Sequence, residues 1–223
     1  MIVIATPHRR YDVLQDALAR QNIHFLVARS PDEMKEERLA SLDPRYIFFP
    51  HWSWKIPPEI HEKYECVIFH MTDVPFGRGG SPLQNLIVRG FLETRLSALR
   101  CTAEMDAGPV YLKETLSLDG SAEDILRRAA QLMASMMLTI IKTEPAPVAQ
   151  QGQPTIFKRR TPKDGDLRPL ADTKAAYDYI RMLDADGYPP AFLDTDELRF
   201  EFSQASLDDD AVYARVKISK KPV

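Results

Sequence analysis

The sequence predicts an α/β fold with a mainly parallel sheet, followed by a small α+β unit. Strand-like and helix-like segments alternate through the first two thirds of the 223 residues, as they do where crossover helices connect parallel strands. A proline-rich stretch without periodicity then interrupts the pattern at 144–154. We therefore expect one domain over 1–150 and a smaller unit over 151–223, which is too short to bury a large core alone.

The first part of the chain contains apolar runs that predict buried strands, separated by helix-like segments. The strands are expected at Met1–Ala5, His24–Ala28, Arg45–Pro50 and Glu65–His70. The helices are expected at Tyr11–Gln21, Asp32–Leu42 and Pro57–Lys63, the last of which is opened by proline. Because ligands bind beyond the carboxyl ends of parallel strands, we expect the chemistry to follow the third and fourth strands.

The remaining elements are expected to include three helices and two pairs of strands. The helices are Ser81–Thr94, Ser121–Lys142 and Asp172–Leu183. Ser81 and Pro82 suit the N-cap and first position of the first of these helices. The strands are Leu96–Glu104 and Pro109–Leu118, which form a hairpin, and Leu198–Phe202 and Val212–Ile218.

The composition argues against several classes of protein. The net charge of −3 provides no bulk basic field to bind a nucleic acid or an anionic membrane. Cys66 and Cys101 are too few for a disulfide framework, so we expect reduced thiols in a cytoplasmic protein. The longest apolar stretch, Met133–Ile141, is too short to cross a bilayer, and the start of the chain has the reverse order of a signal peptide. Whether the chain forms a homo-oligomer stays open.

The run from His70 to Asn85 carries the strongest chemical signal. His70 ends an apolar strand, which would fix the imidazole, and precedes a loop rich in Pro and Gly, which would admit a substrate. A histidine at a strand end is more often structural, but the expected hairpin returns Asp106 to the same strand end. A carboxylate there would orient and charge the imidazole for acid–base work. The alternative is a turn carboxylate that caps Gly108 and its neighbours.

Four ordered motifs extend this signal along the chain. They are H-M-T-D-V-P-F-G-R-G-G-S-P-L-Q from His70, E-M-D-A-G around Asp106, F-K-R-R-T-P-K-D-G from Phe157 and Y-I-R-M-L-D-A-D-G-Y-P-P-A-F from Tyr179. Together they resemble the folate-dependent formyltransferases, which modify glycinamide ribonucleotide, methionyl-tRNA and amino sugars. The resemblance covers residues 45–195 and implies a Rossmann-like formyltransferase domain followed by a small C-terminal α+β unit.

The segment F-P-H-W-S-W from Phe49 resembles a tryptophan-rich segment of the short sugar-nucleotide N-formyltransferases of the pseudaminic acid pathway. The resemblance implies transfer of a formyl group from N10-formyltetrahydrofolate to the 4-amino group of a UDP-linked amino-dideoxy sugar. It implies no metal, and a nucleotide sugar and a folate as small-molecule partners. Two alternatives stay open. A methionyl-tRNA formyltransferase would share the chemistry but needs a surface for an acidic RNA, and a catalytically silent protein would bind folate or nucleotide sugar without turnover.

The resemblance assigns the chemistry to His70 and Asp106, with one departure from the family pattern. His70, held positive by Asp106, would stabilise the negative charge that develops on the formyl oxygen. Most of the family places an asparagine two positions before the histidine, where this chain has Ile68. Candidate replacements for the missing amide are Asn85, Gln84 and His51. We favour His51 because adjacent parallel strands bring their carboxyl ends together.

The resemblance also indicates where the two substrates bind. Folate is expected along Trp54, Lys55 and Ile56 and along the turn Met105, Asp106 and Gly108, largely through backbone groups. One of the two tryptophans in this region is expected to pack in the core.

The nucleotide sugar is expected at Arg78, Gly79, Gly80, Ser81, Gln84 and Arg160. A guanidinium beside a helix N-terminus suits a diphosphate. Arg78 is equally suited to hold the loop against a carboxylate. At most one residue of the basic run Lys158, Arg159 and Arg160 is expected to reach a ligand.

Overall fold

The computed structural model describes residues 1–221, which divide into two compact units. Unit 1 consists of Met1–Gly79, Thr94–Leu116 and Leu126–Ile156. Unit 2 consists of Gly80–Glu93, Ser117–Ile125 and residues 157–221. Two earlier segments therefore group with the C-terminal part of the chain, so the compact units do not follow the single expected boundary near residue 150. A boundary between folding domains at that position stays a prediction.

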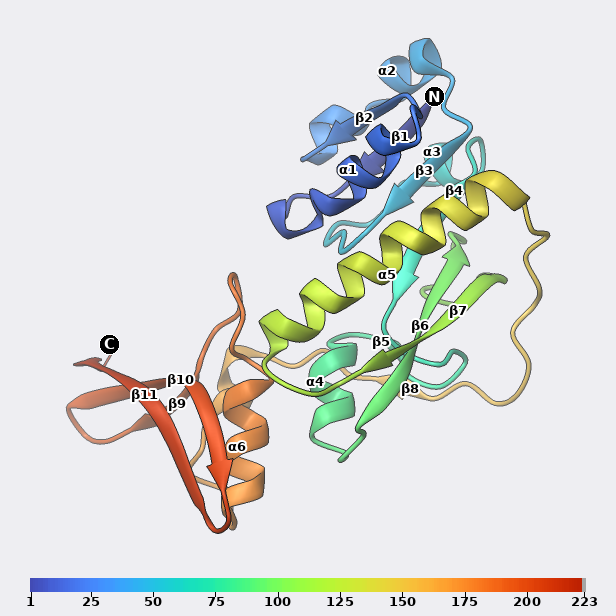
Figure 1. Cartoon of the computed structure of the whole chain (residues 1–223). Helices are drawn as coiled ribbons and strands as arrows, with labels where there is room; N and C mark the ends of the chain where they lie inside the picture. The colour runs from blue at the N-terminus through green and yellow to red at the C-terminus, as the bar shows by residue number, and fades with distance from the viewer. Residues whose placement is uncertain (222–223) are drawn as a thin grey trace. The chain divides into compact units, whose positions relative to one another are not determined.

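Within residues 1–221, a six-stranded sheet forms the centre of unit 1 (Figure 1). Its strands are β1 (Ile2–Ala5), β2 (Phe25–Ala28), β3 (Tyr46–Phe49), β4 (Cys66–His70), β6 (Glu93–Arg100) and β7 (Val110–Ser117). They lie in the order β2-β1-β3-β4-β6-β7. The first four are parallel to one another and β6 is antiparallel to β4. The predicted α/β fold with a mainly parallel sheet is confirmed.

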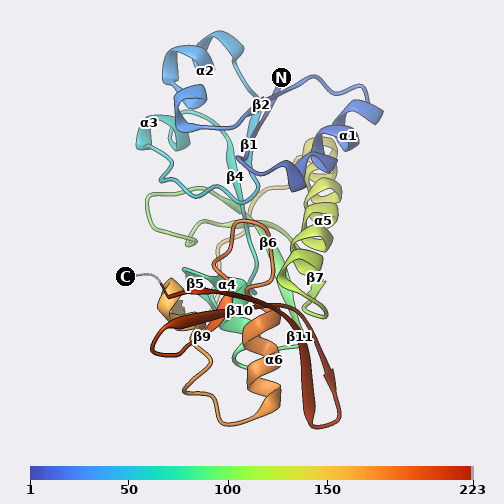
Figure 2. The same cartoon turned by 90° about the vertical axis from the view of Figure 1, so that its left-hand side faces the viewer.

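The helices of unit 1 cover both sides of this sheet. They are α1 (Val13–Arg20), α2 (Glu36–Leu42), α3 (Pro58–His61) and α5 (Ala122–Thr143). The short 3-10 turns η1 (Arg9–Tyr11) and η2 (Pro31–Met34) precede α1 and α2. α1 and α5 lie on one side of the strands, and α2 and α3 lie on the other (Figure 2). Because both faces are covered, every residue of β1 and β3 is buried.

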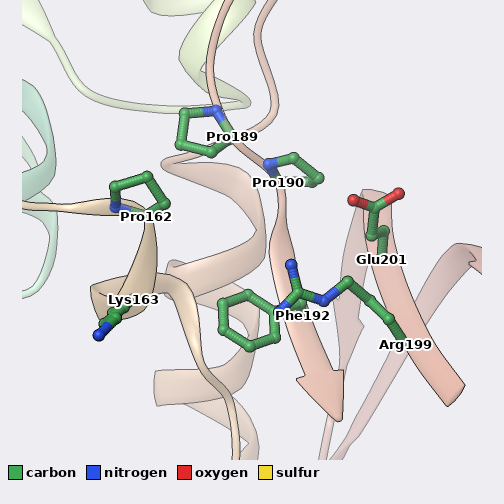
Figure 3. Close-up of a pocket in the computed structure, with 7 residues that line it drawn as sticks. All are labelled: Pro162, Lys163, Pro189, Pro190, Phe192, Arg199 and Glu201. Carbon is green, nitrogen blue, oxygen red and sulfur yellow. The ribbon is translucent and has the colours of Figure 1, made fainter. Parts of the chain in front are cut away.

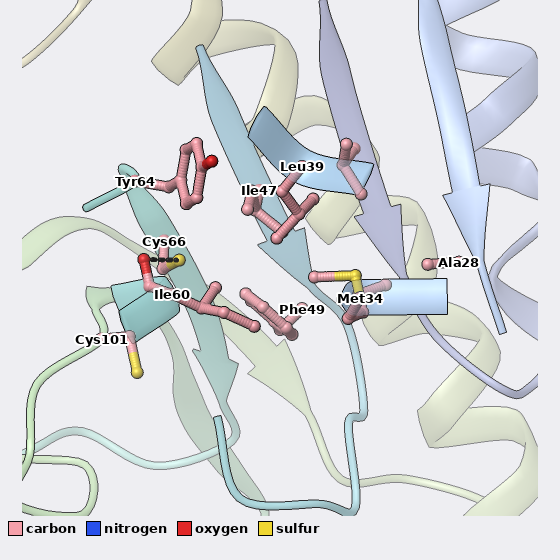
Figure 4. Close-up of a cluster of buried hydrophobic side chains, with 11 residues drawn as sticks. Ala28, Met34, Leu39, Ile47, Phe49, Ile60, Tyr64, Cys66 and Cys101 are labelled. Carbon is pink, nitrogen blue, oxygen red and sulfur yellow. Dashed lines mark hydrogen bonds between the residues drawn. The ribbon is translucent and has the colours of Figure 1, made fainter. Parts of the chain in front are cut away.

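One apolar cluster lies between the parallel strands and the side that carries α2 and α3 (Figure 4). Its members are Val3, Ala5, Ala28, Met34, Leu39, Ile47, Phe49, Ile60, Tyr64, Cys66 and Cys101. Alternate residues of β1 and β3 contribute to it, as the two-residue period of a strand requires. Ile68, Trp52 and Ile56 pack against this cluster while staying partly exposed. The cluster therefore packs beneath the carboxyl ends of β3 and β4, on the side of the sheet that carries α2 and α3.

Unit 2 combines short helices with an antiparallel sheet. Its helices are α4 (Pro82–Ile87), η3 (Pro162–Gly165) and α6 (Thr173–Arg181). Its sheet contains β9 (Ala191–Asp194), β10 (Leu198–Asp208) and β11 (Ala211–Lys220). Two further short strands, β5 (Arg78–Gly79), which belongs to unit 1, and β8 (Ile156–Phe157), pair with each other. α6 begins where the Asp172 carboxylate accepts a hydrogen bond from the Ala175 N–H at 2.7 Å.

The predicted helix over Ser81–Thr94 is wrong in its length, because α4 ends at Ile87. Gly90 has a φ of 78° and its N–H donates to the Ile87 carbonyl. A glycine in the left-handed region closes a helix at little cost, so the chain turns there and enters β6 at Glu93. The helical spacing of apolar residues continues across this turn, so the sequence pattern did not indicate it. The short strand β9 was not predicted.

Residues 1–221 contain no helix that is both long enough and apolar enough to span a bilayer. The cytoplasmic location expected from the sequence stays a prediction.

Candidate active site

The pairing of β3 and β4 sets the geometry at the carboxyl ends of these strands. Phe49 of β3 lies opposite Ile68 of β4 in a parallel register. His51 and His70 each lie two residues beyond that pair. Neighbouring parallel strands thus bring one histidine each to the same edge of the sheet, where ligands of such sheets bind.

Each ring nitrogen of His70 faces an oxygen atom. Nε2 lies 2.8 Å from the carbonyl oxygen of Gly77, and because a carbonyl only accepts, Nε2 carries the proton and donates. The Thr72 hydroxyl donates to the same carbonyl at 3.3 Å. Nδ1 lies 3.6 Å from Oδ1 of Asp106, and both side chains are largely buried. The loop after β4 therefore closes on the histidine and fixes its orientation.

Asp106 occupies a turn that its neighbours hold tightly. Its φ is 52°, in the left-handed region that Asp tolerates better than most residues. Its Oδ2 accepts a hydrogen bond from the Gly79 N–H at 2.9 Å, so the carboxylate joins His70 to the loop after β4 instead of capping Gly108. A Cβ at Gly108 would lie 1.8 Å from the Arg100 carbonyl oxygen, so this position requires glycine. The structure brings the two predicted catalytic residues together, while their roles stay predictions.

Gln150 completes the support of this turn. Its Nε2 donates to the carbonyl oxygens of Asp106 and Gly108, both at 2.8 Å. Its Oε1 accepts from Nε of Arg78 at 3.1 Å and from Nη2 at 2.9 Å. Gln150 was not predicted as a site residue, because it lies in an irregular stretch whose composition indicates a linker. Nothing in that stretch distinguishes it from Gln151 or Gln153.

Arg78 holds the loop in the way that the sequence analysis left open. Besides Gln150, its guanidinium pairs with Glu104 through Nη1 at 3.2 Å. The side chain is 12% exposed. Its expected contact with a diphosphate stays a prediction, and such a contact would have to share the guanidinium with Gln150.

His51 lies among groups that oppose a charge on its ring. Its Nδ1 is 3.0 Å from the Tyr11 hydroxyl, and its ring centroid is 4.6 Å from that of His8. Burial, together with the charges of His8 and Arg10, lowers the pKa of His51 to about 4. His51 is therefore neutral near pH 7. Where the Tyr11 hydroxyl donates to Nδ1, Nε2 carries the ring proton and can act as a donor.

Position 68, where the sequence resemblance implies an asparagine, carries an isoleucine in this chain. Ile68 lies against the apolar cluster together with Trp52 and Ile56. The structure thus uses Ile68 to support the strand ends. The replacement of the missing donor by His51 stays a proposal.

The two tryptophans divide as expected between packing and exposure. Trp52 packs against the cluster, with its ring centroid 5.8 Å from that of Phe49. Trp54 meets Trp52 edge to face at 4.7 Å and is 43% exposed. Lys55 is exposed, Ile56 is partly buried and Met105 is 71% exposed. Trp54 and Met105 are thus apolar side chains that unit 1 leaves in contact with solvent.

The predicted site residues of unit 2 are engaged in holding that unit together. Ser81 has a φ of 50°, and its hydroxyl accepts from the Arg160 N–H at 3.0 Å, so its predicted side-chain capping of α4 is wrong. A Cβ at Gly80 would lie 2.6 Å from Cα of Arg159. The amide of Gln84 donates to the Met182 carbonyl at 3.3 Å.

The side chains of Asn85 and Arg160 also donate hydrogen bonds to backbone carbonyl oxygens of unit 2. Nδ2 of Asn85 lies within 3.0 Å of the carbonyl oxygens of Gly80, Ser81 and Lys158. The guanidinium of Arg160 donates to the Asp164 carbonyl at 2.8 Å. Neither amide considered as a replacement for the missing asparagine, Gln84 or Asn85, is without a partner. Ligand contacts of these residues stay predictions.

Unit 2 also contains a pocket of about 170 Å³ (Figure 3). Its lining residues are Pro162, Lys163, Pro189, Pro190, Phe192, Arg199 and Glu201. The Arg199 guanidinium lies 4.1 Å from the centre of the Phe192 ring and pairs with both carboxylate oxygens of Asp194. The one arginine that lines the pocket is therefore already held by Phe192 and Asp194.

The chemistry of the cysteines separates them from catalysis. Burial and, to a smaller extent, the nearby charge of Asp106 together raise the pKa of Cys101 to about 11. Burial likewise raises the pKa of Cys66. Both side chains are protonated thiols near pH 7, and a thiol is a poor nucleophile compared with a thiolate. Group transfer through a cysteine is not supported.

Comparison with known proteins identifies the family. A model of the C-terminal domain of methionyl-tRNA formyltransferase matches residues 162–219. A solved structure described as methionyl-tRNA formyltransferase from Clostridium thermocellum is 41% identical, covers 99% of both chains and superposes with a TM-score of 0.96. The chain belongs to the formyltransferase family.

Curated relatives carry two different descriptions. A methionyl-tRNA formyltransferase of Wolinella succinogenes is 27% identical over 68% of this chain and 52% of its own length. A GDP-perosamine N-formyltransferase of Brucella melitensis is 27% identical over 82% of this chain and 73% of its own length. The chain thus spans about half the length of the first of these relatives.

Proposed function

We propose that this protein transfers a formyl group from N10-formyltetrahydrofolate to the amino group of a nucleotide-linked sugar. The observation that carries the proposal is the buried pair of His70 and Asp106, 3.6 Å apart, at the carboxyl end of β4. The family of the chain is a formyl-transferring one, and this pair occupies the positions of the family motif. Following the sequence resemblance, we expect the acceptor to be the 4-amino group of a UDP-linked amino-dideoxy sugar.

The residues of the site fit the demands of amine formylation. The amine nitrogen forms a bond to the formyl carbon while the bond to N10 breaks, the amine loses a proton and N10 gains one. His70 and Asp106 can hold and move that proton. His70 can also stabilise negative charge on the formyl oxygen through Nε2, which then exchanges its hydrogen bond from the Gly77 carbonyl to the substrate.

The surface of unit 1 also suits a folate. N10-formyltetrahydrofolate supplies the formyl group and presents a flat ring system. Trp54 and Met105 are exposed apolar side chains that such a ring would cover, and the solvent exposure of both is otherwise unexplained. The backbone groups of Lys55 and Ile56 and of the Met105–Gly108 turn would hold the polar edge of the ring.

Charge favours a small acceptor over an RNA. Between residues 162 and 219, the segment that matches the tRNA-enzyme domain, seven Lys and Arg residues face thirteen Asp and Glu residues, a net charge of −6. A nucleic acid needs phosphate contacts from Lys and Arg, and an acidic surface repels it. A nucleotide sugar needs only one or two local cationic or backbone contacts.

Methionyl-tRNA is the second candidate acceptor. The 41% identical structure with nearly full mutual coverage bears that description, as does the relative from Wolinella succinogenes. The third reading, a protein that binds folate or nucleotide sugar without turnover, is favoured by the absence of an asparagine at position 68.

One experiment separates the three. The protein is incubated with N10-formyltetrahydrofolate and, in turn, with UDP-, dTDP- and GDP-linked amino sugars and with methionyl-tRNA, and the products are weighed by mass spectrometry. We expect a mass gain of one formyl group on a nucleotide sugar and none on methionyl-tRNA. Formylation of the tRNA alone would overturn the proposed acceptor. Binding of folate by calorimetry without any product would support the silent reading.

A further inference from the structure

Gln150 uses every polar atom of its amide in holding other groups. Its Nε2 donates to two carbonyl oxygens of the turn that carries Asp106, and its Oε1 accepts twice from Arg78. One amide thus connects two segments that are distant in sequence, the turn around Asp106 through Nε2 and Arg78 through Oε1. Such complete use of a side-chain amide indicates a fixed geometry.

The same two segments hold the carboxylate of Asp106. Gly79, the residue after Arg78, donates its N–H to Oδ2 of Asp106 at 2.9 Å, while Oδ1 faces His70. Gln150 therefore bridges the main chain of Asp106 to the side chain of Arg78, and Gly79 bridges the main chain beside Arg78 back to the Asp106 side chain. These contacts form a closed ring of interactions. The carboxylate can shift relative to His70 only if a member of the ring gives way.

The backbone of the turn makes this support necessary. Asp106 has a φ of 52°, in the left-handed region, which is less favourable than the usual backbone regions even for Asp. The side chain of Met105 is exposed and gives the turn little packing. The hydrogen bonds from Gln150 to the two carbonyls flanking Ala107 compensate for that strain.

We propose that Gln150 is a positioning residue that sets the distance and direction of the Asp106 carboxylate toward His70. The proposal rests on the function proposed above, because it gives Gln150 a role in the turnover of that site. Gln150 acts through Asp106 and touches no substrate. Only an uncharged amide of this length supplies two donors to the turn and one acceptor to Arg78.

The test compares four variants of the full chain. Gln150→Glu keeps an acceptor for Arg78 but removes both donors and places negative charge against two carbonyl oxygens. Gln150→Ala removes all four contacts and serves if the first variant fails to fold. Gln151→Glu and Gln151→Ala are the matched controls, because Gln151 is the exposed neighbour in the same irregular segment.

Turnover and spectroscopy are read out separately. We expect both Gln150 variants to lower kcat by up to about 10²-fold, as small misplacements of reacting groups do, with KM for both substrates changed by less than about threefold. Without substrate, we expect changed ¹⁵N shifts of the His70 ring and faster solvent exchange of the Gly79 amide. Both Gln151 variants should match the wild type.

Two results would overturn the proposal. One is a wild-type kcat in folded Gln150→Glu or Gln150→Ala. The other is a lowered kcat with unchanged His70 ring shifts and Gly79 exchange, which would show that Gln150 acts elsewhere. If the wild-type protein formylates none of the acceptors, the proposed function fails, whereas the two spectroscopic readouts still decide whether Gln150 positions Asp106.

Discussion

Two histidines lie at the carboxyl ends of neighbouring parallel strands, yet their surroundings have opposite electrostatic character. His70, the last residue of β4, faces the Asp106 carboxylate at 3.6 Å. His51 after β3 faces His8 and Arg10, and burial with these charges lowers its pKa to about 4. The register of β3 and β4 places both at one edge of the sheet. The comparison shows that the residues around a histidine, more than its place in the fold, determine which proton chemistry it can perform.

The two environments suit complementary tasks in one reaction. A histidine beside a carboxylate can carry positive charge and pass a proton. A buried neutral histidine can donate a hydrogen bond to an oxygen without itself titrating near pH 7. This division of roles can be broken by substitution at either strand end.

The largest expected effect comes from breaking the pair at β4. We expect His70→Ala and Asp106→Asn each to lower kcat by about 10²–10⁴-fold, because each removes part of one proton-transferring unit. The double variant should be little slower than the slower single variant. Steady-state kinetics on the formylated acceptor measures this, and circular dichroism checks the fold. Near-wild-type turnover of His70→Ala would remove His70 from the mechanism.

The sequence predicts the strands around this site because their pattern is simple. β1, β3 and β4 are continuous apolar runs, as expected for strands of a covered parallel sheet. The expected return of Asp106 to the end of β4 also follows from pattern, because a hairpin of known length must bring its turn back. α4 differs, because the turn at Gly90 lies within an uninterrupted apolar period.

The support of the site could not be predicted in the same way. Gln150 acts through contacts with residues 42 to 72 positions away in the chain, and no local pattern marks it. Likewise, the lowered pKa of His51 depends on burial and on the charges of His8 and Arg10, which lie about 40 positions earlier in the chain and come close to His51 only in the folded protein. The type of residue at a strand end can be read from the local sequence, whereas the distant residues that contact it cannot.

The second prediction concerns the strand end at β3. If His51 supplies the missing oxyanion donor, His51→Ala should lower kcat by about 10²–10³-fold and leave folate affinity little changed. Tyr11→Phe should have a smaller effect, because it removes the hydrogen bond to Nδ1 and keeps the ring. Steady-state kinetics measures the effect on kcat, and calorimetry measures the effect on folate affinity. A His51→Ala variant with full turnover would confine His51 to packing against Tyr11 and His8.

The third prediction uses the pH dependence of stability. The unfolded chain protonates His51 near pH 6.5, whereas the folded protein does so only near pH 4. Between these values the unfolded state binds the extra proton, so the free energy of unfolding falls as the pH falls. We expect wild type to lose up to about 3 kcal/mol more than His51→Gln between pH 7 and pH 4.

Urea unfolding at a series of pH values measures that difference. The matched control is His24→Gln, since His24 is exposed and distant in sequence from the site. The control should follow the wild-type curve. Parallel curves for wild type and His51→Gln would contradict the lowered pKa of His51.

The smallest expected effect tests whether the strand end at β3 also binds folate. Trp54 is 43% exposed and contacts Trp52 edge to face, so its indole can stack on a flat ring without rebuilding the core. An aromatic pair contributes about 0.5–1.5 kcal/mol beyond the area that it buries, so Trp54→Ala should weaken folate binding by at least about twofold to tenfold. Trp54→Phe should recover most of that affinity, because it keeps an aromatic face. Calorimetric titration of the three proteins with folate, together with thermal unfolding to confirm equal stability, gives the comparison. Equal affinity in Trp54→Ala and wild type would place the folate ring away from this strand end and leave β3 with His51 as its sole candidate contribution to the site.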